Sequence, residues 1–293
     1  MRAASNVFEL IGKTPMVRIT KMSPNSNVDI YAKLEGFNPT GSLKDRIALR
    51  MIERAEKAGE LTNDKMILEA TSGNTGISVA WVAALKGYKC VIVLPNSVSD
   101  ERKKILNALG ANLIFVSNEA EAIKKAREMT NDKRYFMTDQ FANEMNWKAH
   151  YLTTGAEIWE QTDGRVTHVV AGIGTAGTIM GVGRRLREFK KDVQVIGVQP
   201  SRQGSKQEGL LYRHDFCPEI CKYEELSEII LVEDEDAFRT TRDLLLKEGL
   251  FVGISSGSTM WGAIQKAKEI NEGLIVAILG DNVFRYLSTK LFG

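Results

Sequence analysis

The glycine-rich segment 172–177 has the residue types of a phosphate-binding turn. It reads Gly-Ile-Gly-Thr-Ala-Gly, follows the apolar run 169–171 and precedes an expected helix. The segment matches the dinucleotide-binding fingerprint, which also requires an acidic residue at the end of the next strand to bind the ribose. That strand ends in Gln199-Pro200. The dinucleotide part of the pattern is therefore missing.

The phosphate-binding part of the pattern is intact. Backbone N–H groups after a tight turn, with neighbouring hydroxyls, suit one terminal phosphate at a helix N-terminus. A glycine turn that only packs a helix against a strand is the alternative. The candidate phosphate ligands are Gly174, Thr175, Ala176, Gly177 and Thr178.

A second strand-to-helix turn, residues 71–76, reads Thr-Ser-Gly-Asn-Thr-Gly. Backbone N–H groups ahead of an apolar helix, surrounded by small polar side chains, suit the carboxylate of a small amino acid. The same residue types are favoured helix caps, so ordinary capping is the alternative here.

Lys44 stands where a helix is expected to begin, in the sequence Gly-Ser-Leu-Lys-Asp-Arg. Most lysines are solvated surface charges. A helix N-terminus disfavours an ammonium ion, however, and so favours an amine that forms an imine. A phosphate site, a carboxylate site and an amine nucleophile together fit pyridoxal phosphate, an aldehyde cofactor with one phosphate.

Short apolar runs alternate with helical patterns along the chain, and these elements must position the three segments. Strands are expected at 28–34, 66–69, 90–94, 113–116, 166–173, 193–198 and 274–279. Helices are expected at 44–57, 75–86, 119–129 and from a cap at Ser99 to residue 109. Strands separated by helices predict βαβ units, and seven or more strands make two parallel sheets plausible.

Length and composition are those of an ordinary globular protein. The 293 residues are 43% hydrophobic and 26% charged, with a net charge of +2. This excludes disordered, collagen-like and disulfide-stapled chains, and gives no reason to expect nucleic acid or a membrane as partner. No run approaches the roughly 20 apolar residues of a membrane span. Three cysteines indicate thiols in a reducing cytoplasm.

Scattered histidines and cysteines offer little further chemistry. His150, His168 and His214 are expected to be packing or surface residues. Cys217 and Cys221 have no accompanying histidine pair, so we expect structural thiols and no metal site.

The order of motifs resembles the cysteine synthase family, fold type II of the pyridoxal-phosphate enzymes, over nearly the whole chain. The form around Lys44 is similar to B-type cysteine synthases and to the core of cystathionine β-synthases. The motifs that carry the resemblance are Ile11–Pro15, Lys44–Arg46, Glu69–Gly76, Thr153–Gly155, Gly174–Thr178, Gly253–Gly257 and Arg285–Thr289.

The resemblance implies an α/β fold with two open, twisted, mainly parallel sheets that carry helices on both faces. It implies a smaller N-terminal domain over residues 38–146, and a larger cofactor-holding domain from residues 1–37 plus 147–293. A homodimer in the cytoplasm is the expected assembly.

The resemblance also implies a role for each site residue. Lys44 would form the Schiff base with the cofactor and move the substrate α-proton. Asn74 would bond the phenolic oxygen, and Ser255 would meet the pyridine nitrogen. The residues that would bind the substrate carboxylate are Thr71, Ser72, Thr75 and Gln140.

The expected reaction is β-replacement on an O-activated L-serine by sulfide, which gives L-cysteine, with O-acetylserine favoured as donor. The alternatives are O-phosphoserine as donor, condensation of serine with homocysteine, and desulfuration of cysteine with release of sulfide. An NAD-dependent dehydrogenase and a non-catalytic small-molecule-binding protein are the rivals from other classes.

Two departures affect specificity. The long aperiodic segment 201–222 is a candidate specificity loop. Its cations Arg202, Lys206 and Arg213 would favour O-phosphoserine if the loop closed over the site, whereas solvated charges would leave O-acetylserine favoured. Asn143-Glu144 replaces the Asn-Pro pair of the family, so we expect a looser turn near Gln140.

Overall fold

The computed structural model describes residues 3–212, 214, 217–289 and 291. The chain forms two compact units, Met1–Leu43 with Trp147–Gly293 and Lys44–Asn146, which we call the first and the second unit. The first boundary between the two units lies between Leu43 and Lys44. The division at residue 38 that the family resemblance implies stays a prediction.

The second unit is a four-stranded parallel sheet with helices. Its strand order is β5-β4-β3-β6. The strands are β3 (Met66–Ala70), β4 (Cys90–Pro95), β5 (Asn112–Val116) and β6 (Tyr135–Met137). The helices are α1 (Lys44–Lys57), α2 (Asn74–Lys86), α3 (Asp100–Ala108) and α4 (Glu119–Met129). The central strand β4 is buried at every position, as in parallel sheets covered on both faces.

Local sequence explains where these helices begin and end. Gly87, with φ +79, closes α2 by bonding its N–H to Ala83 and Ala84 carbonyls. Ser99 does stand at the N-cap of α3. Its hydroxyl makes no capping bond, however, and is buried without a partner. Acidic Asp100 and Glu101 in the first turn complement the helix dipole instead.

The first unit contains a six-stranded sheet in the order β1-β2-β10-β7-β8-β9. Only the β1–β2 pair is antiparallel among its strands. The strands are β1 (Met16–Ile19), β2 (Val28–Leu34), β7 (His168–Gly172), β8 (Gln194–Pro200), β9 (Glu228–Val232) and β10 (Gly273–Leu279). Together the two sheets confirm the expected α/β class with two mainly parallel sheets.

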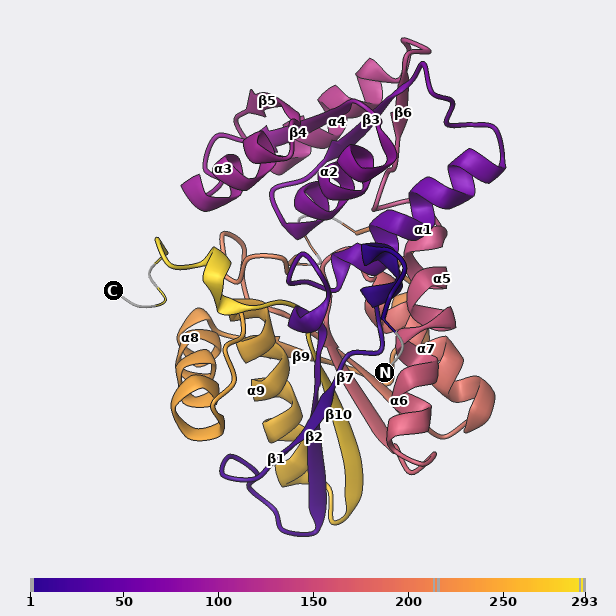
Figure 1. Ribbon diagram of the computed structural model, residues 1–293. Coiled ribbons are helices and arrows are strands. Elements are labelled where there is room, and N and C mark those ends of the chain that lie inside the picture. The colour runs from indigo at the N-terminus through magenta and orange to yellow at the C-terminus, as the bar shows by residue number, and fades with distance from the viewer. Residues whose placement is uncertain (1–2, 213, 215–216, 290, 292–293) are drawn as a thin grey trace. The chain divides into compact units, whose positions relative to one another are not determined.

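Helices cover both faces of this sheet (Figure 1). The α-helices are α5 (Met145–Leu152), α6 (Thr154–Gln161), α7 (Gly177–Phe189), α8 (Asp234–Asp243) and α9 (Ile254–Glu269). A π-helical turn, η4 (Leu244–Glu248), follows α8. Short 3-10 turns are η1 (Val7–Leu10), η2 (Glu35–Phe37), η3 (Tyr223–Glu225) and η5 (Val283–Arg285).

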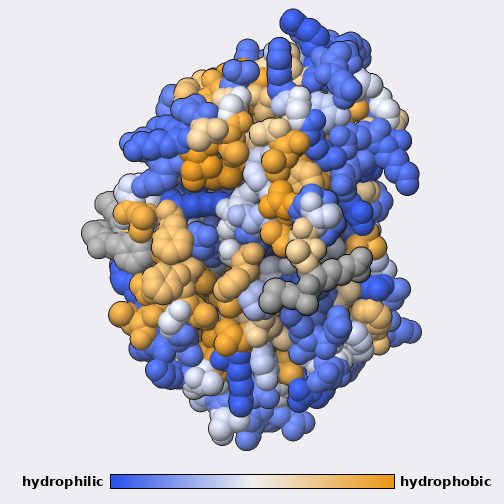
Figure 2. All heavy atoms as spheres, viewed as in Figure 1, coloured by the Kyte–Doolittle hydropathy of each residue, from blue (hydrophilic) through white to orange (hydrophobic). Residues whose placement is uncertain are grey.

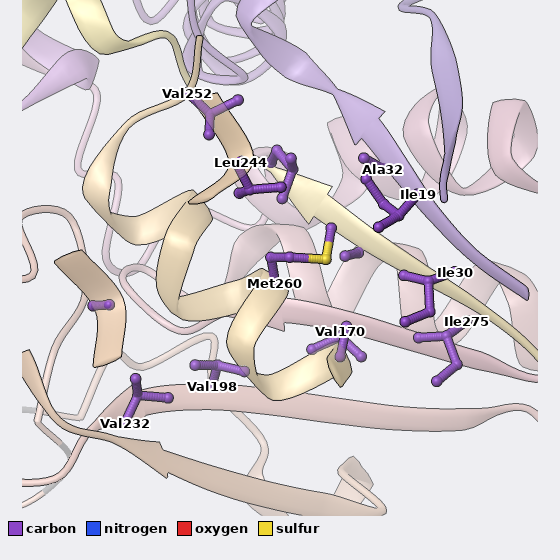
Figure 3. Packing of buried hydrophobic residues seen from close by; sticks show 14 of the residues in the cluster. Ile19, Ile30, Ala32, Val170, Val198, Val232, Leu244, Val252, Met260 and Ile275 are labelled. Atoms are coloured by element: carbon purple, nitrogen blue, oxygen red, sulfur yellow. The ribbon is translucent and has the colours of Figure 1, made fainter. Parts of the chain in front are cut away.

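Neighbouring residues of β7 show how the two layers are filled. Val170 belongs to the core beneath α8 and α9, where Met260 lies at the centre of the packed side chains (Figure 3). Val169 belongs to the core beneath α6 and α7. Alternate side chains of a strand point to opposite faces, so β7 contributes to both cores and its end is held firmly.

Hydrophilic side chains cover much of the face seen in Figure 2, and hydrophobic side chains form several groups among them. Phe251 and Phe284 are both more than half exposed and stack with ring centroids 6.1 Å apart.

In the part of the chain described here, no helix is long and apolar enough to cross a bilayer.

Candidate active site

The turn after β7 presents an uncapped helix N-terminus. Ala176, at φ +68, precedes α7 and makes no side-chain capping bond. The first N–H groups of an α-helix have no partner within the helix, and the dipole makes this end positive. The 13 residues of α7 are enough for both effects. The geometry therefore suits a phosphate.

Backbone packs directly against backbone in this phosphate turn, residues 174–178. A Cβ atom on Gly174 would lie 2.2 Å from the Gly209 carbonyl oxygen. Leu211 donates its N–H to the Ile173 carbonyl at 2.9 Å, which fixes the overlying chain. Only glycine fits at position 174, and the close approach keeps the space in front of the turn free of a side chain from that residue.

A buried imidazole supports the same turn from behind. His150 is fully buried on α5, and its Nε2 lies 3.2 Å from the Thr178 hydroxyl. Its Nδ1 lies 2.9 Å from the hydroxyl of Thr154 at the start of α6. Sequence reasoning predicted only a packing or surface role for His150. No spacing signal links it to Thr178, since the two residues are 28 positions apart.

Ser255 lies in the first unit as well, in the first turn of α9. Its carbonyl accepts the Thr259 hydroxyl at 2.9 Å, and a Cβ on Gly172 would lie 3.4 Å from that hydroxyl oxygen. The start of α9 therefore faces the end of β7, where the phosphate turn begins. Gly253 at the N-cap packs against Asp281, so this end of α9 is fixed.

Lys44 and Asn74 are the first residues of α1 and α2 in the second unit, and both are half-buried. The Ser78 hydroxyl donates to Asp45 at 2.6 Å, which joins the N-terminal parts of the two helices. Just before Lys44, Leu43 donates its N–H to the Gly280 carbonyl at 2.9 Å. The lysine is thus held at both sides along the chain.

The turn 71–76, which we call the carboxylate turn, also ends in an uncapped helix. Gly73 at the N-cap of α2 makes no side-chain capping bond, and its own N–H bonds the Thr71 hydroxyl at 3.0 Å. Gly76 packs closely, because a Cβ there would lie 2.9 Å from the Thr71 methyl. A Cβ on Gly73 would meet nothing within 4 Å.

Gln140 is buried and its amide orientation follows from its partners. Its Nε2 donates to the Ala70 carbonyl at 3.1 Å, and its Oε1 accepts the Thr75 hydroxyl at 2.5 Å. A carbonyl can only accept, so the NH2 end must face Ala70 and the oxygen must face Thr75. The single proton of the Thr75 hydroxyl is therefore directed to Gln140 and not outward.

The segment after Gln140 is held more firmly than the sequence indicated. Asn143 donates from Nδ2 to the Thr138 carbonyl at 2.9 Å and accepts the Met145 N–H at 2.9 Å. Asn146 Nδ2 donates to the Gln140 carbonyl at 2.8 Å. The expectation of a loosened turn was wrong, because asparagine side chains close the turn without the proline.

Ser72 contacts a carboxyl group of the protein itself. Its hydroxyl donates to Glu119 at the start of α4 across 2.5 Å. Burial raises the pKa of Glu119, while the hydrogen bonds from Ser72 and the charge of Arg102 act in the opposite direction. The carboxylate turn is therefore joined to α4 through this hydroxyl.

The segment 201–222 contains neither helix nor strand among its described residues. Its first half is anchored by Gln207, whose Nε2 donates to the Val232 carbonyl at 2.8 Å and whose Oε1 accepts the Ser258 hydroxyl at 2.8 Å. Arg202 is 68% exposed and lies within 4.0 Å of Glu233 and Asp234. Arg213 lies outside the described residues.

Each unit thus brings together part of the candidate site. The first unit holds the phosphate turn and Ser255. The second unit holds Lys44, Asn74, the carboxylate turn and Gln140. Among the residues described, no group of three or more His, Cys, Asp or Glu side chains is placed to hold a metal ion.

Comparison with known proteins identifies the family to which the chain belongs. A profile of the family described as "Pyridoxal-phosphate dependent enzyme" matches residues 7–281. The chain belongs to this family. It is 44% identical to cysteine synthase B of Escherichia coli (strain K12) over 294 residues, which covers 99% of this chain and 96% of that protein. The resemblance to cysteine synthases is thereby confirmed.

Solved structures agree. The O-acetyl serine sulfhydrylase isoform 3 of Entamoeba histolytica superposes with a TM-score of 0.93 at 36% identity, covering 99% of this chain and 92% of that one. A hydrogen sulfide-producing enzyme of Fusobacterium nucleatum superposes with a TM-score of 0.92 at 37% identity, covering 97% of this chain and all 100% of the other. The fold is therefore that of fold type II pyridoxal-phosphate enzymes.

The cofactor of this family fits the residues present. The N-terminus of α7, without a side-chain cap, is the positive end of a helix and suits a phosphate, and Gly174 adds no side chain to the turn before it. A lysine amine, an amide and a hydroxyl are available for the aldehyde, the phenolic oxygen and the ring nitrogen. Pyridoxal phosphate is accordingly the cofactor, and when bound it supplies an electron sink for chemistry at the substrate α-carbon.

Proposed function

We propose that the protein makes L-cysteine from O-acetyl-L-serine and sulfide by β-replacement. The observation that carries the proposal is the similarity to cysteine synthase B over 99% of the chain, and the two anion-binding turns support it. The similarity to an O-acetyl serine sulfhydrylase favours acetate as the leaving group.

Lys44 has two tasks in this proposal. Its amine would hold the cofactor, which supplies the electron sink. During turnover Nζ would take the α-proton of the substrate, so that acetate can leave the β-carbon. After sulfide has added to the β-carbon, Nζ returns the proton to the α-carbon. A position at the start of α1 suits both tasks, because a helix N-terminus favours the neutral amine.

The substrate carboxylate is bound by the carboxylate turn. The donors that we assign to it are the backbone N–H groups of Asn74 and Thr75 and the second N–H of Gln140 Nε2, because the N–H groups of Ser72 and Gly73 already bond Glu119 and the Thr71 hydroxyl. The Thr75 hydroxyl orients Gln140, because its proton is directed to Gln140 Oε1. This refines the role that the sequence predicted for Thr75. Its hydroxyl positions Gln140, and only its backbone N–H is a candidate donor to the substrate carboxylate.

The cofactor contacts that we assign come from several turns of the chain. We assign the phosphate to the backbone of Gly174–Thr178 and to the hydroxyls of Thr175 and Thr178. Asn74 would bond the phenolic oxygen, and Ser255 would meet the ring nitrogen. A hydroxyl at that nitrogen would leave the ring largely uncharged, which would favour rapid β-elimination over transamination.

A substrate panel tests the proposal. O-acetylserine, O-phosphoserine, serine and cysteine are each offered with sulfide or with homocysteine, and cysteine, cystathionine and released sulfide are measured. We expect O-acetylserine with sulfide to give the highest kcat/KM. Higher kcat/KM for O-phosphoserine, for serine with homocysteine or for cysteine desulfuration would replace the proposed reaction. Desulfuration is included because one solved relative is described as producing hydrogen sulfide.

A homodimer in the cytoplasm completes the proposal, as is usual in the family. Light scattering of the purified protein measures the mass in solution, for which we expect twice the 32.6 kDa of one chain.

A further inference from the structure

Glu69 is a fully buried carboxyl group immediately before the carboxylate turn. It lies in β3, two residues ahead of Thr71, with 0% of its surface exposed. Oε1 accepts the N–H of Ala70 at 2.9 Å. Oε2 accepts the Thr138 hydroxyl at 2.5 Å and the N–H of Gln140 at 3.2 Å. Burying a carboxyl group costs folding free energy, which its three hydrogen bonds offset. Those bonds also fix the position of the groups that donate them.

These bonds lead directly to the substrate side of the turn. Glu69 holds the backbone of Gln140, and the Gln140 side chain bridges Ala70 and Thr75. One continuous chain of hydrogen bonds therefore runs from the buried carboxyl to the first turn of α2. Thr138 also donates its N–H to the Leu68 carbonyl at 3.0 Å, so the segment is fixed against β3.

The surroundings of Glu69 disfavour a negative charge. Asp139 follows Thr138 in the same segment, and Cys90 faces Glu69 from β4. Arg127 of α4 lies 3.7 Å from Asp139 and offsets part of that charge. Burial, with a smaller contribution from Asp139, raises the pKa of Glu69 to about 8, against the opposing hydrogen bonds.

We propose that Glu69 is a positioning residue of the substrate-carboxylate site and that it acts through Gln140 as the neutral acid. The inference rests on the proposed function only in requiring an amino-acid substrate. As the neutral acid, Oε2 donates its proton to the Thr138 hydroxyl, which can turn to the Leu68 carbonyl 3.5 Å away. Ionised Glu69 would place a negative charge beside a turn that binds a carboxylate. Substrate affinity should therefore fall as the pH rises through about 8.

The experiment measures binding of L-alanine, which has the amino-acid carboxylate but no β-leaving group, to the cofactor-loaded enzyme by calorimetry from about pH 7 to about pH 9. If only the neutral acid binds, Kd of the wild type rises about tenfold across this range, in proportion to one plus the ratio of ionised to neutral acid. Glu69→Gln cannot ionise. We expect its Kd to be about fivefold higher at pH 7, for one lost hydrogen bond, but to rise less.

The ratio of the wild-type Kd to the Glu69→Gln Kd is the decisive quantity, because titration of the alanine amine cancels in it. Equal pH dependence in the two proteins overturns the inference. Glu53→Gln, an exposed position on α1, is the matched control and should follow the wild type. With O-acetylserine, Glu69→Gln should raise KM and change kcat less than twofold, whereas general damage to the unit would lower kcat as well.

Two further measurements keep the inference testable. If Glu69→Gln does not fold, the infrared C=O band of a protonated carboxyl is followed in the wild type over the same pH range. A wild type without a protonated buried carboxyl at about pH 7 contradicts the neutral-acid role. If the wild type binds L-alanine but makes no cysteine, the proposed function fails while the role of Glu69 is still decided by the binding series.

Discussion

The two turns that we propose to bind anions are built from different groups. In the phosphate turn, Gly174 lies against the Gly209 carbonyl, so backbone contacts backbone. In the carboxylate turn, side chains make the contacts. Thr75 bonds Gln140, Ser72 bonds Glu119, and the buried Glu69 holds Gln140 in place.

This difference matches how long each ligand stays. A cofactor that remains through many turnovers gains from a rigid cradle whose shape is set by the packing of glycines. A substrate that enters and leaves in each turnover gains from a turn that is supported by side chains, because their hydrogen bonds and charges can be adjusted. We therefore expect substitutions in the first turn to affect stability and cofactor retention, and those in the second to affect KM.

The largest effect is expected at Lys44, which we propose to act on both the cofactor and the substrate. Lys44→Ala removes the amine proposed to attach the cofactor and to move the α-proton, so kcat should fall by about 10³-fold or more. Borohydride reduction followed by mass spectrometry should show no cofactor attached to the chain, while circular dichroism should match the wild type. Turnover near the wild-type rate would remove Lys44 from the mechanism.

A pair of glycine substitutions tests rigidity directly. Gly174→Ala forces its Cβ to within 2.2 Å of a carbonyl oxygen, and the resulting shift should cost about 1–3 kcal/mol of unfolding free energy. Gly73→Ala places its Cβ in open space at φ −130°, so it should cost less than about 0.5 kcal/mol. Urea unfolding of both variants measures the difference, and equal losses would contradict it.

A pair of threonine substitutions has the smallest expected effect. Thr75→Val deletes a hydroxyl that bonds Gln140, and should raise KM for O-acetylserine about fivefold, for about 1 kcal/mol of hydrogen bonding. Thr178→Val deletes the hydroxyl beside His150, and should weaken cofactor binding by a similar factor. Steady-state kinetics measure KM for O-acetylserine, and equilibrium dialysis measures the dissociation constant of the cofactor. If each variant changed both constants equally, the two turns would not be independent.

Much of this arrangement can be read from the sequence, because strong periodicity and capping are local properties. The helices at Lys44–Lys57 and Glu119–Met129 were expected with the bounds they have, and so was β2. Strand β6 was not predicted because it has only three residues. Strand β9 was not predicted because its residues are mostly half-buried at a sheet edge and show no strong alternation.

The contacts that tune the site were harder to predict. His150 reaches Thr178, and Glu69 reaches Gln140, across 28 and 71 positions of sequence. Neither pair forms a motif, since the fold alone brings the partners together. The effect of Glu144 in place of the family's proline could only be judged once the two hydrogen bonds of the Asn143 side chain were visible.

The interrupted sequence of the first unit has a consequence for synthesis on the ribosome. Strand β2 pairs on one side with β1, but its other partner is β10, with Val28 opposite Gly273. At about 5–20 residues per second, that edge of β2 stays unpaired for roughly 10–50 s after it is made. The contiguous second unit, Lys44–Asn146, is complete well before then. A nascent chain that stalls between Gly172 and Gly273 therefore carries the complete second unit and two open strand edges, those of β2 and β7, the form in which edge-to-edge aggregation begins.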